Sequence, residues 1–163
     1  MLCLSYGSNM SITRIQDRVP SARPVAVATL PKHRLKFHKV SNDGSGKCDA
    51  QATEDTNDYV IGVLFEISDN EKPALDNKEG LGVGYDEKEV EVVTTDGRTM
   101  KSVMYFATSI DPSRRPYTWY KNHVLKGAKE NGLPEEYISK IEAVIADDDP
   151  DRARNERESS IYR

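Results

Sequence analysis

The sequence has few cysteines, few large aromatic residues and no long apolar run, and these scarcities exclude several classes of protein. It contains two cysteines, three phenylalanines and one tryptophan among 163 residues. No apolar stretch approaches the ~20 residues that span a bilayer, so we expect no membrane-spanning segment. The first residues lack a basic segment followed by a long apolar one, so we predict no secretory signal and a cytoplasmic protein.

The two cysteines, Cys3 and Cys48, both lie in stretches typical of strands. In a chain without an export signal, such a pair is more often two buried thiols than a disulfide. Nothing cationic lies beside Cys3 to lower its pKa, so we interpret it as a core residue rather than a nucleophile. The three histidines have no metal-binding spacing to either cysteine. We therefore predict no disulfide and no metal site.

Basic residues are not in excess, since 23 lysines and arginines face 27 acidic residues and give a net charge of -4. Nucleic-acid-binding proteins normally carry a basic excess, so we expect no nucleic-acid partner. The one basic cluster, residues 32–39, alternates with apolar residues as on the solvated face of a half-buried strand. Lys36 and His38 fall on that face, and no interleaved aromatic residues suit base stacking.

The chain length fits one ordinary domain. We predict a single domain over residues 1–146, followed by a charged segment over residues 147–163. Ten of the seventeen residues in this segment are charged. It is either a short helix after Pro150 or a frayed tail, and we expect it to be solvated rather than functional.

Apolar periodicity predicts a mixed α/β chain. Alternating or continuous apolar runs predict strands over residues 2–6, 25–30, 35–38, 59–67, 87–95 and 100–108, the last two joined by the turn Asp96-Gly97. Apolar residues at helical spacing predict helices over residues 12–19, 70–79, 117–128 and 134–145. Asn9 or Ser11 can cap the first helix.

The second predicted helix has clear signals at both ends. Ser68 and Glu71 match a capping box, and capping by Asn70 places Pro73 at the third helical position, where its missing N–H costs little. Gly80 follows the last helical residue and is expected to end the helix in the left-handed conformation.

The common catalytic motifs of hydrolases, zinc proteases, P-loop proteins and dinucleotide-binding proteins are absent. The glycine-rich run at residues 80–84 follows a helix rather than a strand, so it is not a dinucleotide fingerprint. The segment Tyr6-Gly7-Ser8-Asn9-Met10 lies between a predicted strand and a predicted helix. Its free N–H groups can bind an anion, although helix capping is the commoner reason for this pattern.

Glu79 lies at the carboxyl end of the second predicted helix. The negative end of the helix dipole disfavours a second negative charge there, and burial would disfavour it further. Both effects suit a carboxylate that accepts a proton near neutral pH. From the pattern alone, an exposed surface glutamate remains the commoner alternative.

Three motifs occur together in a fixed order: YGSNM at residues 6–10, LDNKEG at 75–80 with Tyr85 soon after, and GAKENGLPEEY at 127–137. Together they resemble the gamma-glutamylcyclotransferases, whose motifs read YGSNL, LDxxEG…Y and, in animal members, GAKENGLPxxY. The resemblance extends over about residues 1–145. The stretch between Gly80 and Tyr85 is one residue shorter than in animal members, so Tyr85 is matched less securely than Tyr120.

The resemblance implies a mixed α/β (α+β) fold in which helices flank a small curved or barrel-like β-sheet. It implies a cofactor-free enzyme that converts a gamma-glutamyl-amino acid into 5-oxoproline and a free amino acid. Glu79 would be the catalytic acid/base. The loop Tyr6, Gly7, Ser8, Asn9 and Met10 would bind the glutamyl moiety, Tyr85 and Tyr120 would line the pocket, and a homodimer would be plausible.

Several alternatives stay open. The substrate could instead be a gamma-glutamyl-amine, a gamma-glutamylated intermediate or glutathione, although relatives that act on side-chain amines tend to carry a YGTL-like loop. A non-catalytic small-molecule-binding relative, or an adaptor that uses the charged tail, would belong to a different class. A non-catalytic binding relative would not need the catalytic acid, and this chain retains Glu79.

Overall fold

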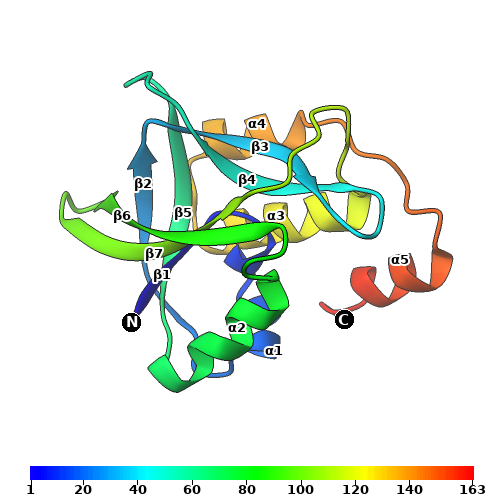
Figure 1. The fold of residues 1–163 in the computed structure, drawn as a ribbon, viewed down its shortest axis with the longest axis horizontal. Helices are drawn as coiled ribbons and strands as arrows, with labels where there is room; N and C mark the ends of the chain where they lie inside the picture. Colours follow the sequence, from blue (N-terminus) through cyan, green and yellow to red (C-terminus); the bar gives the residue numbers. More distant parts are fainter.

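Five strands close into a small barrel in the computed structural model, which describes all 163 residues. They are β1 (Leu2–Ser5), β2 (Arg23–Pro31), β5 (Tyr59–Glu66), β6 (Tyr85–Thr94) and β7 (Thr99–Ala107). Their order is β1-β5-β2-β6-β7, and a parallel pairing of Cys3 with Val103 closes the ring between β1 and β7 (Figure 1). The barrel-like sheet expected from the resemblance is confirmed.

The strands β3 (His33–Val40) and β4 (Gly46–Ala52) form a separate antiparallel pair that packs against β5 and β7. Its register shifts between Lys36 and Lys39. The prediction that His38 lies on the solvated face was therefore wrong, because the irregularity turns this ring inward. Nε2 of His38 lies 2.7 Å from Oδ2 of buried Asp49, whose Oδ1 accepts the Ala107 N–H and ties β4 to β7.

The chain forms five α-helices, the last of which lies apart from the barrel (Figure 1). They are α1 (Ile12–Arg18), α2 (Lys72–Glu79), α3 (Thr118–Glu130), α4 (Glu135–Glu142) and α5 (Arg152–Ser159), with short 3₁₀ turns η1 (Ser8–Met10) and η2 (Asp69–Glu71) before α1 and α2. The predicted hairpin is also present, with Gly97 in the left-handed region at its turn. No helix is both long and apolar enough to cross a bilayer.

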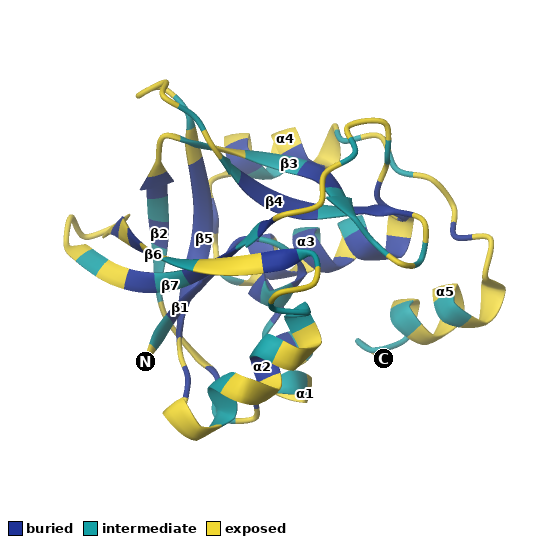
Figure 2. Cartoon of the chain, in the orientation of Figure 1, coloured by how far each residue is buried: buried dark blue, intermediate teal, exposed yellow.

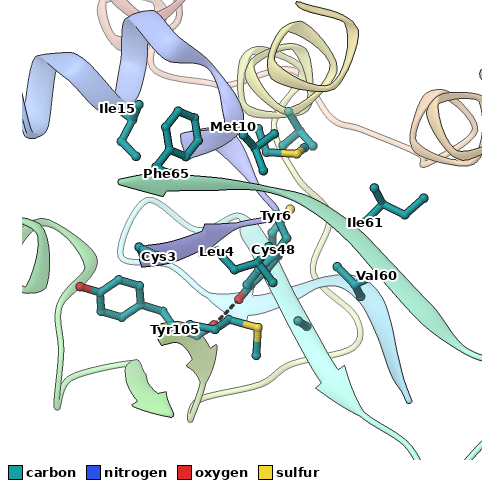
Figure 3. Packing of buried hydrophobic residues seen from close by; sticks show 14 of the residues in the cluster. Cys3, Leu4, Tyr6, Met10, Ile15, Cys48, Val60, Ile61, Phe65 and Tyr105 are labelled. Carbon is teal, nitrogen blue, oxygen red and sulfur yellow. Dashed lines mark hydrogen bonds between the residues drawn. The ribbon is translucent and has the colours of Figure 1, made fainter. Parts of the chain in front are cut away.

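One continuous cluster of buried side chains joins the barrel interior to α1, α3 and α4. Figure 2 shows buried residues along β5, β4 and the inner side of α3, and exposed residues on the outer faces of α2 and α5. Figure 3 shows part of the cluster near the end of β1, where Tyr6 lies among Leu4, Cys48 and Tyr105. The candidate site adjoins this densely packed region.

The start of α2 differs from the prediction. No side chain caps it, and the chain passes through η2 so that Glu71 is the residue before the helix. The carboxylate of Glu71 instead accepts hydrogen bonds from the backbone N–H and hydroxyl of Ser21, which ties this corner to the segment after α1. The predicted end is confirmed, since Gly80 caps α2 with φ 71°.

The charged segment from Asp147 onward is docked on the protein rather than wholly solvated, and its helical alternative is the one observed. The carboxylate of Asp149 is fully buried and accepts hydrogen bonds from Trp119 and Arg154. Further along, Glu158 lies 3.0 Å from Nε2 of His123. Sequence composition described the charges correctly but could not show that buried side chains of α3 would pair with them.

Candidate active site

A small open cavity of about 50 Å³ lies where the end of β1, the η1 turn, the end of α2 and strand β4 meet. All but one of the residues predicted for the site line it, namely Tyr6, Gly7, Ser8, Asn9, Glu79, Tyr85 and Tyr120. Leu4, Ser5, Cys48 and Tyr105 complete the wall and were not predicted. Segments more than 100 residues apart in the chain therefore meet at one cavity.

Glu79 is the last residue of α2, and the left-handed turn at Gly80 lets the chain leave the helix there. Its side chain is 16% exposed, so the carboxylate is largely enclosed. It accepts hydrogen bonds from Nδ2 of Asn9 at 2.5 Å and from Nη1 of Arg18 at 3.3 Å. Arg18 was missed by the sequence analysis, which had no means of placing the end of α1 beside the end of α2.

The η1 turn presents unused backbone donors to the cavity. The N–H groups of Gly7, Ser8 and Asn9 donate to no protein acceptor, because the first intraturn bond is from the Met10 N–H to the Gly7 carbonyl. Ser11, one of the two predicted caps, accepts the N–H of Arg14 at the start of α1. Helix capping is therefore observed, and three free backbone donors precede the capped helix.

Met10 does not belong to the cavity, contrary to the sequence-based prediction. Its N–H is already bonded to Gly7, and its side chain is fully buried in the core. Met10 is the last residue of the tight 3₁₀ turn, and this turn places it against α3. Gly7 itself is required by close packing, since a Cβ there would lie 2.9 Å from Cβ of Cys48 and 3.3 Å from the Tyr120 hydroxyl.

Three tyrosines of the wall remain neutral phenols. Burial raises the pKa values of Tyr6, Tyr85 and Tyr120 well above their usual range, and the Glu79 charge acts in the same direction. Tyr6 donates to the Tyr105 carbonyl at 2.7 Å, and Tyr85 donates to the Cys48 carbonyl at 2.6 Å. These two hydroxyls therefore donate to backbone carbonyls and do not donate to a ligand.

Tyr120 differs from the other two because its oxygen is an acceptor. It receives the N–H of Cys48 at 3.0 Å, and its own proton goes to no protein oxygen. Its other polar neighbour is the Cys48 thiol, a weak acceptor whose own pKa is raised to about 12 by burial. Tyr120 is thus the tyrosine of the wall whose hydroxyl can donate to a ligand.

Comparisons with known proteins agree with the motifs. The model of the AIG2-like family matches residues 59–141. Human and bovine gamma-glutamylcyclotransferases are each 34% identical to this chain over 165 aligned residues, which cover 98% of this chain and 87% of either relative. This chain belongs to the gamma-glutamylcyclotransferase family. A solved structure of a gamma-glutamyl cyclotransferase has a TM-score of 0.89 at 33% identity, over 99% of this chain and 98% of that one.

The gamma-glutamylcyclotransferase fold also extends to more distant proteins. A yeast gamma-glutamyl cyclotransferase described as specific to glutathione has a TM-score of 0.56 at 15% identity, covering 100% of this chain and 96% of its own. At that identity the likeness concerns the fold alone.

The GAKENG part of the gamma-glutamylcyclotransferase motif at residues 127–132 has a structural role that the sequence analysis did not derive. Gly127 lets α3 touch the η1 turn, since a Cβ there would lie 2.4 Å from the carbonyl carbon of Met10. Asn131 donates to the Met10 carbonyl at 2.9 Å, and Glu130 accepts the Ile12 N–H at 2.6 Å. The motif thus holds the turn that carries the free donors.

Proposed function

We propose that this protein converts gamma-glutamyl-amino acids into 5-oxoproline and a free amino acid. The observation that carries the proposal is that the Glu79 carboxylate, the free N–H groups of Gly7 to Asn9 and the Tyr120 hydroxyl share one cavity. A proton acceptor, a set of anion-binding donors and a neutral donor are what this reaction requires. The membership of the family supports the same activity.

The reaction begins with the substrate's α-ammonium group, which gives a proton to the Glu79 carboxylate. The free amine then attacks the γ-carbonyl carbon, and a C–N bond forms within a five-membered ring. The negative charge that develops on the carbonyl oxygen requires hydrogen-bond donors, which the η1 amides or Tyr120 can supply. The bond to the leaving nitrogen breaks as the Glu79 carboxyl returns the proton to it. The ring nitrogen gives up its remaining extra proton, which the departing amine takes up as it becomes an ammonium group, so the neutral lactam forms and the carboxylate is regenerated.

This route needs no nucleophile from the protein, because the attacking group belongs to the substrate. The enzyme's main task is to fold the glutamyl chain so that its amine approaches the carbonyl. Well-oriented intramolecular reactions gain up to about 7–11 kcal/mol from such positioning. Proton transfer by a placed carboxylate adds about 10²–10⁴-fold. The tyrosines that line the cavity beside Gly7 suit this task of holding the glutamyl chain in a bent conformation.

The Glu79→Gln variant tests the assigned acid/base. Glutamine keeps the shape of the side chain and cannot take a proton, so we expect the rate of 5-oxoproline release to fall by about 10²–10⁴-fold. The rate is measured by mass spectrometry, and circular dichroism confirms that the variant is folded. A folded Glu79→Gln protein with the wild-type rate would remove Glu79 from the mechanism.

The leaving group is tested with a substrate panel. Gamma-glutamyl dipeptides, gamma-glutamyl-amines and glutathione are incubated separately with the wild-type protein, and 5-oxoproline is measured in each case. We expect release from the dipeptides. Preferential release from gamma-glutamyl-amines or glutathione would favour those alternatives, and ligand binding without release from any member would favour a non-catalytic relative.

A homodimer, supported by the family resemblance, and a cytoplasmic location are further parts of the proposal. Light scattering of the purified protein tests the first, with a mass near twice 18.3 kDa expected. Cell fractionation tests the second.

A further inference from the structure

Both donors to the Glu79 carboxylate reach the same oxygen. Nδ2 of Asn9 and Nη1 of Arg18 each donate to Oε1. Arg18 also donates to Oδ1 of Asn9 at 3.1 Å, so the three side chains form a closed triangle of hydrogen bonds. This third bond fixes which end of the Asn9 amide faces the carboxylate, because a guanidinium can only donate.

The second carboxylate oxygen, Oε2, has a different environment. No protein group donates to Oε2, and it is not among the buried atoms that lack a partner, so solvent reaches it. A carboxylate oxygen that already accepts two hydrogen bonds is a poor site for a proton, and an unpartnered oxygen is a better one. The two oxygens of Glu79 are therefore inequivalent.

The fold brings this triangle together from the ends of three elements. Asn9 lies in η1, while Arg18 and Glu79 are the last residues of α1 and α2. The side chains of Arg18 and Glu79 are 19% and 16% exposed, so the pair is largely shielded from solvent. Shielded ion pairs with hydrogen bonds define a geometry more strictly than exposed ones.

We propose that Asn9 and Arg18 are positioning residues that hold Oε1 of Glu79 and leave Oε2 to move the proton. The inference rests on the proposed function and extends it. It gives a role to the Asn9 side chain, whereas the resemblance implied that this loop binds the glutamyl moiety through its backbone groups. The backbone N–H of Asn9 remains free for that purpose.

Two consequences distinguish this role from a structural one. Without the fixed orientation, proton transfer slows while glutamyl binding persists, so kcat falls more than KM changes. Misplacement by about 1 Å can cost about 10²-fold in rate. Because Arg18 acts through Glu79, its loss should cost no further activity once that carboxylate is absent.

The test compares Arg18→Gln and Asn9→Ala with the wild type on the gamma-glutamyl dipeptide that is turned over best. We expect kcat to fall by about 10–100-fold in both variants, with KM within about threefold. Arg18→Lys restores part of the rate, because it keeps a cation that can donate to Oε1 of Glu79. Arg18→Gln placed in the Glu79→Gln background costs no further activity, since it acts through that carboxylate.

Arg14→Gln is the matched control. Arg14 lies one turn earlier on α1 and is 12% exposed, but it pairs with Glu158 rather than Glu79. We expect its kcat and KM to stay close to the wild type. The proposal is overturned if folded Arg18→Gln keeps the wild-type kcat, or if Arg14→Gln lowers kcat as much. An inactive wild-type protein would instead overturn the proposed function, and the positioning role with it.

Discussion

At the scale of single residues, the cavity separates side chains that look alike in the sequence. Tyr85 and Tyr120 were both predicted to line the pocket, and both contact the backbone of Cys48. Tyr85 gives its proton to the Cys48 carbonyl, whereas Tyr120 accepts the Cys48 N–H and keeps its proton. The two hydroxyls differ in whether they donate to the Cys48 backbone or accept from it. This difference decides which hydroxyl can donate a hydrogen bond to a substrate.

Replacing each tyrosine by phenylalanine tests this difference. Tyr85→Phe and Tyr120→Phe each leave one buried backbone group of Cys48 without a partner, so both should lose about 1–3 kcal/mol of stability. Only Tyr120→Phe also removes the free donor, and we expect its kcat/KM to fall about tenfold further than that of Tyr85→Phe. Urea unfolding and steady-state kinetics measure the two effects. Equal losses of activity would show that both tyrosines have a structural role and that neither donates to the substrate.

At the scale of secondary-structure elements, the position of the η1 turn depends on its contact with α3. Helix α3 contacts the turn along Gly127, and Asn131 and Glu130 bind the backbone on either side of Ser11. The free N–H groups of the turn are therefore held by a helix that begins more than 100 residues later in the chain. This contact explains why a glycine occupies the interior of α3, where glycine is a poor helix former.

A Gly127→Ala substitution tests the contact, because two effects of opposite sign compete. Helix propensity alone predicts a gain of about 0.5–1 kcal/mol. The new methyl group would lie 2.4 Å from backbone atoms of Met10 and Ser11, and overpacking of this kind costs about 1–3 kcal/mol. We expect the steric cost to prevail, with a lower Tm and lower activity.

Lys129→Ala is the control for this experiment, since Lys129 lies on the exposed side of the same helix and its pair with Glu142 is largely solvated. Its stability should stay within about 0.5 kcal/mol of the wild type. A Gly127→Ala protein more stable than the wild type would show that α3 does not press on the turn as described.

At the scale of the whole molecule, the C-terminal segment ties its last helix to the core. The Arg154 guanidinium holds the pKa of Asp149 down to about 2, and Trp119 donates to the same carboxylate. Near the end of the chain, the Tyr162 hydroxyl contacts His123 and donates to the hydroxyl of Ser11, the residue that caps α1. The segment thus reaches the helix that carries Arg18.

The pH dependence of stability tests this attachment. The pKa of Asp149 is lower in the folded protein than its ordinary value of 3.8, so its charge stabilises the fold above about pH 4. This contribution is lost as the pH falls through about 2. Asp149→Asn keeps the shape and removes the charge, so the difference in Tm between wild type and variant should be largest above pH 5 and narrow toward pH 2.5. A constant difference over this range would contradict the assignment.

The sequence by itself determined most of the strands and helices and most of the predicted residues that line the cavity. Apolar periodicity located the hairpin β6–β7 and helix α3, Gly80 marked the end of α2, and the three motifs identified Glu79 and the turn at residues 6–10. These features depend on local propensity or on short motifs, which are readable from neighbouring residues.

Only the tertiary structure decided which groups meet. It placed Arg18 against Glu79, turned Met10 into the core, buried His38 through an irregular register and docked Asp149 on Trp119. Each of these outcomes depends on a contact between segments distant in the chain, or on a bulge that shifts the alternation of a strand. Such contacts follow from packing of the whole barrel and its helices, which local patterns do not encode.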